Sequence, residues 1–308
     1  MRFLAALLLL AAPAMAQMTA LPEPIQARIR AIGPTMGAAG VASTGEALRP
    51  AMPATPPPSL RDASYGPDPR NRLDVWTSAG IASPVPGSIP SPVPGRPARP
   101  VLVFVHGGGF LGGDKSRPGV FYYDNIAAWA AGHGMVGVNL TYRLAPAHTY
   151  PAVVEDIAAA LAWLRANIAA HGGDPARIIL MGQSAGAAHV ADYLAAHADA
   201  PGVAAAVLVS GVYQHHTRMP ETAYYGAAGA THSSLPGLAR LRIPVLASIA
   251  ELEPQGFREH GLALRAALPA ARFLDLAGHN HFSTVFAIGS ADAGLSGAIL
   301  ELAQRSRN

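Results

Sequence analysis

The chain of 308 residues is half apolar and only 13% charged, with a formal net charge of +3 at pH 7. Its basic residues are scattered and nearly all arginine, and no basic block is interleaved with aromatic residues, so we expect no nucleic-acid partner. No apolar run reaches the ~20 residues that span a bilayer, and the chain has no cysteine, so its stability must come from a core rather than from disulfides.

The first residues resemble an export signal. Arg2 supplies a positive start, an apolar stretch runs from Phe3 to Ala12, and Ala14-Met15-Ala16 matches the small-residue pattern of a cleavage site. We therefore predict a signal peptide over residues 1–16 and a mature chain that begins at Gln17. The protein would be exported, periplasmic or secreted, with no membrane attachment after cleavage. The alternative interpretation is a buried N-terminal helix.

Two proline-rich stretches lie on either side of the first predicted strand. Residues 17–60 are rich in Pro, Ala and Gly, and we interpret them as an N-terminal arm or linker that packs loosely. Residues 81–100 contain Ser-Pro-Val-Pro-Gly twice, and we expect an extended loop between two strands. The folded domain would then cover residues 61–308.

The rest of the chain alternates between short apolar runs and longer amphipathic segments. This pattern is typical of a mostly parallel, twisted sheet with helices on both faces, which is an α/β fold. We expect strands at 73–76, 101–106, 135–142, 177–182, 204–210, 243–250 and 271–277, and helices at 119–132, 152–170, 185–197, 255–268 and about 292–305.

Residues capable of chemistry follow several of these strands. His106-Gly107-Gly108-Gly109, Gln183-Ser184-Ala185, Glu251 with Glu253, and His279 with His281 each come directly after a predicted strand. Ligands of such sheets bind at the carboxyl ends of the strands. The sequence therefore predicts that a serine, carboxylates and histidines meet at one edge of the sheet.

Ser184 lies in the sequence Gly-Gln-Ser-Ala-Gly, between a buried strand and a helix. A sharp turn at this point pushes the serine hydroxyl out of the sheet and directs the first amides of the helix toward it. A serine hydroxyl needs a base to become nucleophilic, and the base needs an acid to orient it. We predict that Ser184 is a catalytic nucleophile.

The glycine run after His106 predicts a second part of the same site. Three glycines allow backbone amides to turn toward a developing oxyanion, and the predicted donors are the amides of Gly108, Gly109 and Ala185. The alternative is a phosphate-binding loop. The run lacks both the Gly-x-Gly-x-x-Gly pattern and the spacing of a P-loop, so we favour the oxyanion hole.

The base and acid follow in the order serine, acid, histidine, which is the chain order of α/β-hydrolases. The residues alone leave Glu251 and Glu253 open as the acid, and His279 and His281 open as the base. The nine other histidines (His133, His148, His171, His189, His197, His215, His216, His232 and His260) are expected at the surface or in packing.

The sequence resembles the α/β-hydrolase superfamily and, within it, the secreted esterases near the hormone-sensitive-lipase-like and kynurenine-formamidase-like enzymes. The resemblance runs from about Tyr65 to the C-terminus, through YGPDPRNRLDVW, VFVHGGGFLGGDKS, NLTYRLAPAHTYPAVVEDIAAALAWL, GGDPARIILMGQSAGA, IPVLASIAELEP and GHNHFS. It implies an α/β-hydrolase fold with no large cap domain, and a carboxylic-ester hydrolase without metal or cofactor. It also assigns Glu253 as the acid, although the family usually has Asp there, and His281, which precedes Phe282, as the base.

The segment from Gly211 to Leu241 is rich in tyrosine and histidine, and we expect it to lie over the site. The alternative is a plain surface loop, and the segment is too short for a large lid. We expect His106, Phe110 and Tyr213 to contact the substrate.

The resulting prediction is an exported serine esterase for short-chain or aryl esters, with Ser184, His281 and Glu253 as the triad. Its partner would be a small-molecule ester. One alternative is an arylformamidase or another amidase that uses the same triad. An alternative of another class is a catalytically inactive hydrolase fold that serves in binding.

Overall fold

A computed structural model describes residues 15–17, 20–78, 98–214, 222–226, 229 and 231–305. Most of the predicted signal peptide and of the predicted 81–100 loop lies outside the described residues. None of the helices in the described part of the chain combines the length and the apolar character needed to cross a bilayer.

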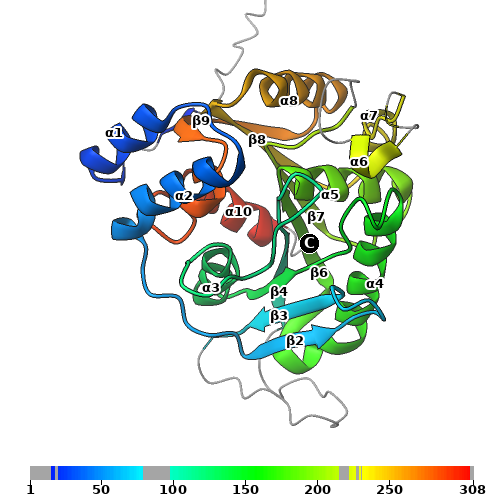
Figure 1. Ribbon diagram of the computed structural model, residues 1–308. Helices are drawn as coiled ribbons and strands as arrows, with labels where there is room; N and C mark the ends of the chain where they lie inside the picture. Colours follow the sequence, from blue (N-terminus) through cyan, green and yellow to red (C-terminus); the bar gives the residue numbers. More distant parts are fainter. Residues whose placement is uncertain are drawn as a thin grey trace, which may run out of the picture.

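The described residues form one sheet of nine strands (Figure 1). Its order is β1-β9-β8-β7-β6-β4-β5-β3-β2, and only β2 with β3 and β3 with β5 pair antiparallel. The strands are β1 (Met15–Gln17), β2 (Leu60–Ser64), β3 (Arg72–Trp76), β4 (Arg99–Val105), β5 (Val136–Leu140), β6 (Gly173–Gln183), β7 (Ala205–Val209), β8 (Val245–Leu252) and β9 (Arg272–Asn280). The predicted mostly parallel sheet is therefore confirmed.

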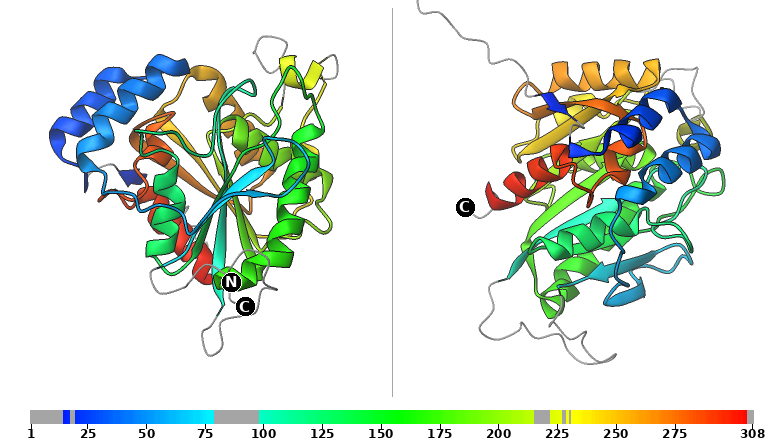
Figure 2. Two further views of the ribbon diagram at one scale, coloured as in Figure 1. Left: turned by 60° about the horizontal axis from the view of Figure 1, so that its bottom comes forward. Right: turned by 90° about the vertical axis from the view of Figure 1, so that its left-hand side faces the viewer.

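The central strands are apolar on both sides because helices cover both faces of the sheet (Figure 2). In β4, Val101, Val103 and Val105 contribute to one core cluster, and Leu102 and Phe104 contribute to the other. One face packs against α4 (Ala152–Asn167), α5 (Ala185–Ala196) and α8 (Gln255–Ala267). The other packs against α1 (Glu23–Ile32), α2 (Gly37–Leu48), α3 (Asp124–Gly132) and α10 (Gly294–Arg305).

Short helical segments complete the described fold. They are α6 (Thr222–Tyr225), α7 (Leu235–Leu238) and α9 (Ser283–Phe286), with 3₁₀ turns at η2 (Arg49–Ala51) and η3 (Ile168–His171). The first two belong to the tyrosine-rich segment 211–241, and α9 directly follows His281.

The N-terminal arm differs from the expectation of a loosely packed linker. It forms α1 and α2, which lie beside the C-terminal elements in both views of Figure 2. Leu21, Ile25 and Ile29 recur every four residues and are buried, with Leu48, in the second core cluster. The high Ala, Gly and Pro content hid this spacing in the sequence.

The short strand β1 lies at the predicted cleavage site. Met15, Ala16 and Gln17 pair in parallel with Asp275, Leu276 and Ala277 of β9. Cleavage after Ala16 would remove two of the three paired residues, so β9 would become the edge strand of the sheet in an exported chain.

Candidate active site

Ser184 occupies a strained turn between β6 and α5. Its φ of 57° and ψ of −124° lie in a region that residues with side chains rarely adopt. The turn is tight enough that a Cβ on Gly182 would lie 2.3 Å from the oxygen of Gly186, and a Cβ on Gly186 would lie 2.1 Å from the oxygen of Val105. Only glycine fits at both positions, which explains the Gly-x-Ser-x-Gly pattern.

His281 and Glu253 form a buried pair at the carboxyl ends of β9 and β8. Nδ1 of His281 lies 2.8 Å from Oε2 of Glu253, and neither side chain is exposed. The second carboxylate oxygen, Oε1, accepts a hydrogen bond from the amide of Ala250 at 3.3 Å. Nε2 of His281 is buried and has no hydrogen-bond partner among the described residues.

The two competing candidates for acid and base are engaged elsewhere. Oε2 of Glu251 accepts a hydrogen bond from the amide of Gly278 at 2.7 Å. Nε2 of His279 lies 2.7 Å from Oδ2 of Asp292, and its Nδ1 lies 3.1 Å from Oγ of Ser283. These hydrogen bonds brace the ends of the two strands that carry the Glu253–His281 pair.

Gln183 joins the three parts of the site, and our sequence analysis assigned it no role. Its Nε2 donates a hydrogen bond to the carbonyl oxygen of His281 at 3.1 Å. On its other side, a Cβ on Gly107 would lie 2.7 Å from Oε1 of Gln183 and 3.1 Å from Cβ of Ser184. The turn at Ser184, the turn at His281 and the glycine loop after His106 therefore lie against one another. In the sequence, the only hint of this role is that Gln183 occupies the first variable position of the Gly-x-Ser-x-Gly pattern.

The loop after His106 turns sharply at Gly108 and Gly109, whose φ angles are 145° and 62°. The amide of Gly112 donates to the oxygen of Gly108 at 3.1 Å, and a Cβ on Gly108 would lie 1.9 Å from the oxygen of Gly112. Ala185 is the first residue of α5, where the helix leaves its amides unpaired. Amide groups of all three predicted donors thus lie on segments that adjoin Ser184.

Comparison with known proteins identifies the fold. The family model described as alpha/beta hydrolase fold matches residues 102–248. The crystal structure of a thermostable esterase from Pseudomonas putida superposes with a TM-score of 0.66 at 18% identity, covering 94% of this chain and 97% of that one. The chain has the α/β-hydrolase fold.

Curated relatives are similar to this chain over shorter stretches. Esterase LipC of Mycobacterium tuberculosis is 36% identical over 126 residues, which is 41% of this chain and 27% of the relative. Carboxylesterase NlhH of the same organism is 47% identical over 88 residues, which is 28% of this chain and 26% of the relative. The matches thus span about a quarter of the length of these relatives.

His106 is buried next to the glycine loop, contrary to our expectation that it contacts substrate. The side chain is completely buried, and its ring stacks on Tyr142 with centroids 4.3 Å apart. The hydroxyl of Tyr142 donates to the carbonyl oxygen of His106 at 2.6 Å. Burial lowers the pKa of His106 to about 4, so the ring is neutral near pH 7.

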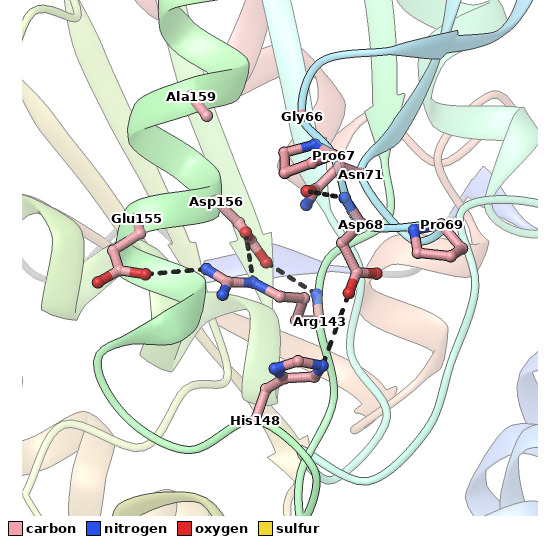
Figure 3. A pocket seen from close by; sticks show the side chains of 10 residues that line it. All are labelled: Gly66, Pro67, Asp68, Pro69, Asn71, Arg143, His148, Glu155, Asp156 and Ala159. Atoms are coloured by element: carbon pink, nitrogen blue, oxygen red, sulfur yellow. Dashed lines mark hydrogen bonds and ion pairs between the residues drawn. The ribbon is translucent and has the colours of Figure 1, made fainter.

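The chain that carries Tyr142 is fixed by its neighbour Arg143 (Figure 3). Nε of Arg143 lies 2.8 Å from Oδ1 of Asp156, and the backbone amide of Arg143 donates to Oδ2 of the same carboxylate at 2.8 Å. The guanidinium also reaches Glu155 at 3.0 Å. The three residues also line a surface pocket. Their contacts with α4 fix the chain next to Tyr142, which packs against His106.

Phe110 and the segment 211–241 meet above that loop. Phe110, which follows the glycine loop, is 4% exposed and stacks on Tyr224 with ring centroids 5.5 Å apart. Tyr213 is also buried, and its hydroxyl accepts a hydrogen bond from the amide of Gly211 at 3.2 Å. In the described residues, both aromatic side chains are therefore covered, and Phe110 packs against the segment expected to lie over the site.

Asp192 of α5 anchors this segment. The buried carboxylate accepts hydrogen bonds from the hydroxyls of Tyr225, at 2.6 Å, and Ser234, and Nε2 of His232 lies 2.9 Å from it. Residues 215–221 of the segment lie outside the described residues. Since α5 begins directly after Ser184, the described part of the segment after residue 221 is tied to the helix that follows Ser184.

No group of three or more His, Cys, Asp or Glu side chains suited to a metal ion occurs in the described residues.

Proposed function

We propose that this α/β-hydrolase cleaves carboxylic esters with Ser184 as nucleophile, His281 as base and Glu253 as acid. The observation that supports this most strongly is the buried His281–Glu253 pair. Nε2 of His281 has no hydrogen-bond partner among the described residues, and the carbonyl oxygen of His281 is bonded to Gln183, the neighbour of Ser184. A histidine oriented by a carboxylate on one nitrogen, with the other unpaired, is suited to accept a proton from a serine.

In the proposed reaction, Nε2 of His281 takes the hydroxyl proton as Oγ of Ser184 attacks the carbonyl carbon. The carbonyl electron pair moves onto oxygen, where the amides of Gly108, Gly109 and Ala185 would stabilise it. Collapse of this intermediate breaks the ester bond, and the departing alcohol takes the proton from His281. Water then attacks the acyl group in the same way, which releases the carboxylic acid and restores Ser184.

Glu253 contributes charge and orientation to this cycle. Its carboxylate holds the Nδ1 side of the ring at 2.8 Å and stabilises the imidazolium that forms at each attack. The longer reach of Glu, relative to the usual Asp, is accommodated because Glu253 lies beyond the end of β8, directly before Pro254 and α8.

We further propose short-chain or aryl esters as substrates. The names of the relatives, esterase and carboxylesterase, support the bond type. Phe110, which follows the glycine loop, packs against Tyr224, and aromatic side chains at this position support a short or aryl substituent.

The test is hydrolysis of p-nitrophenyl esters of increasing acyl length, with an aryl formamide as the competing substrate. Ser184→Ala should lower turnover by on the order of 10⁵–10⁶-fold while the protein stays folded. His281→Gln should be similarly inactive, and His133→Gln, at an exposed site on the end of α3, is the matched control. Faster turnover of the formamide would favour the amidase. A folded wild type inactive on all substrates would favour a binding protein.

A further inference from the structure

The N-terminal helix α2 contacts the turn that carries His281. Nδ2 of Asn280 donates a hydrogen bond to Oγ1 of Thr44 at 3.0 Å, and both side chains are completely buried. Thr44 lies in the third turn of α2, and Asn280 is the last residue of β9. The bond therefore joins the N-terminal arm to the residue next to the proposed base.

The close approach of α2 depends on small residues on two of its sides. Gly40 lies one helical turn before Thr44, and a Cβ there would lie 2.5 Å from Oγ1 of Thr35 and 3.0 Å from Cε2 of Phe282. A Cβ on Gly45 would lie 2.7 Å from Cε1 of Tyr122. A larger residue at Gly40 would crowd Phe282, which follows His281, and one at Gly45 would crowd Tyr122.

Asn280, which precedes His281, connects this contact to the backbone that follows His281. Its Oδ1 accepts hydrogen bonds from the amides of Phe282, at 3.2 Å, and Ser283, at 3.0 Å. With Oδ1 held by the turn, Nδ2 has one orientation, and in that orientation it meets Thr44. The asparagine side chain thus closes the turn, and Thr44 fixes the asparagine.

We propose that Thr44 is a positioning residue for His281, acting through Asn280, an inference that rests on the proposed esterase function. His281 is held at its ring by Glu253 and at its carbonyl by Gln183. Thr44 holds Asn280, the residue before His281, so α2 adds a third contact that fixes the direction of Nε2 of His281. A misplacement of about 1 Å in such a group costs up to about 10²-fold in rate.

The test compares three substitutions in the full-length chain. Thr44→Val keeps the shape of the side chain and removes the acceptor, so Nδ2 of Asn280 loses its partner. Thr44→Ser restores the hydroxyl. Ser43→Ala is the control, because Ser43 lies on the same helix and its hydroxyl donates to the backbone oxygen of Gly40 at 3.3 Å rather than to the turn at His281.

The readouts are kcat and KM on p-nitrophenyl acetate, together with Tm. Thr44→Val should lower kcat about tenfold, which is ~1.4 kcal/mol in activation free energy, with KM changed less than about twofold. Thr44→Ser should recover kcat to within about twofold of wild type, and Ser43→Ala should match wild type. A drop in kcat alone, rescued by serine, reflects placement of the base rather than folding.

Three results would overturn the proposal. One is a Thr44→Val enzyme with wild-type kcat, whatever its Tm. Another is loss of kcat that Thr44→Ser fails to restore. The third is that Thr44→Val and the smaller Thr44→Ala both fail to fold, which would make the bond a stability contact. The proposed function fails separately, if wild type and Ser184→Ala hydrolyse the ester equally.

Discussion

Glu253 offers the sharpest test of the proposed triad. Glu253→Gln keeps the size of the side chain and an oxygen that can accept from Nδ1 of His281, but it removes the negative charge. Opposite unit charges 2.8 Å apart attract by about 6 kcal/mol at an effective dielectric constant of about 20. The retained hydrogen bond offsets part of that loss, so we expect about 3–5 kcal/mol in the transition state. This corresponds to roughly 10²–10⁴-fold in turnover.

Glu251→Gln is the matched control two residues away. Glu251 bonds to the amide of Gly278 and does not touch His281, so this change should cost less than about tenfold. Both purified variants would be assayed on one short-chain ester, with folding checked by circular dichroism. If Glu251→Gln were the damaging change, the assignment of the acid would be wrong by two residues. If neither change mattered, the acid would come from another strand or the enzyme would work as a Ser-His pair.

Further expected outcomes concern acid stability, the nucleophile turn and export. Burial lowers the pKa of His106 to about 4 and that of His189 to about 3. The unfolded chain therefore binds these protons first, and stability should fall as the pH drops from about 6.5 toward 4. The loss at pH 5 should be about 2 kcal/mol for each histidine in urea unfolding, and His189→Phe should remove roughly half of that dependence. Gly186→Ala should prevent folding or abolish activity, because its Cβ would overlap the oxygen of Val105; a folded, active variant, by circular dichroism and ester assay, would contradict the described turn. Intact-mass analysis of exported protein should show a chain that begins at Gln17, and a chain retaining Met1 in the cytosol would refute export.

The elements that carry the site were predictable because their signals are local. A buried strand, Gly-Gln-Ser-Ala-Gly and a helix occur within a short stretch, and the same holds for the glycine loop after β4. Glu251 and Glu253 were harder to separate, because residues two apart on a strand point the same way. Their side chains point in different directions in the structure because β8 ends at Leu252, so the alternation of a strand no longer applies to Glu253. Family resemblance, rather than periodicity, had favoured Glu253.

The contacts that brace the site could not be predicted, because they join residues far apart in the sequence. Thr44 and Asn280 are 236 positions apart, and Tyr142 lies 36 positions from the carbonyl of His106 that it holds. His106 was assigned to substrate because it adjoins the glycine loop, yet the stacking of Tyr142 turns its ring into the core. In the arm, Ala and Gly masked helices whose apolar residues are few but regularly spaced.

Asp192 has a practical consequence for changing the specificity of this protein. The carboxylate holds Tyr225, Ser234 and His232, and it lies on the helix that begins at Ser184. This one carboxylate therefore fixes the described chain after residue 221 to the helix that follows Ser184. A substitution of Asp192 would therefore release three contacts at once, whereas substitutions that spare its three partners would leave the attachment to α5 in place.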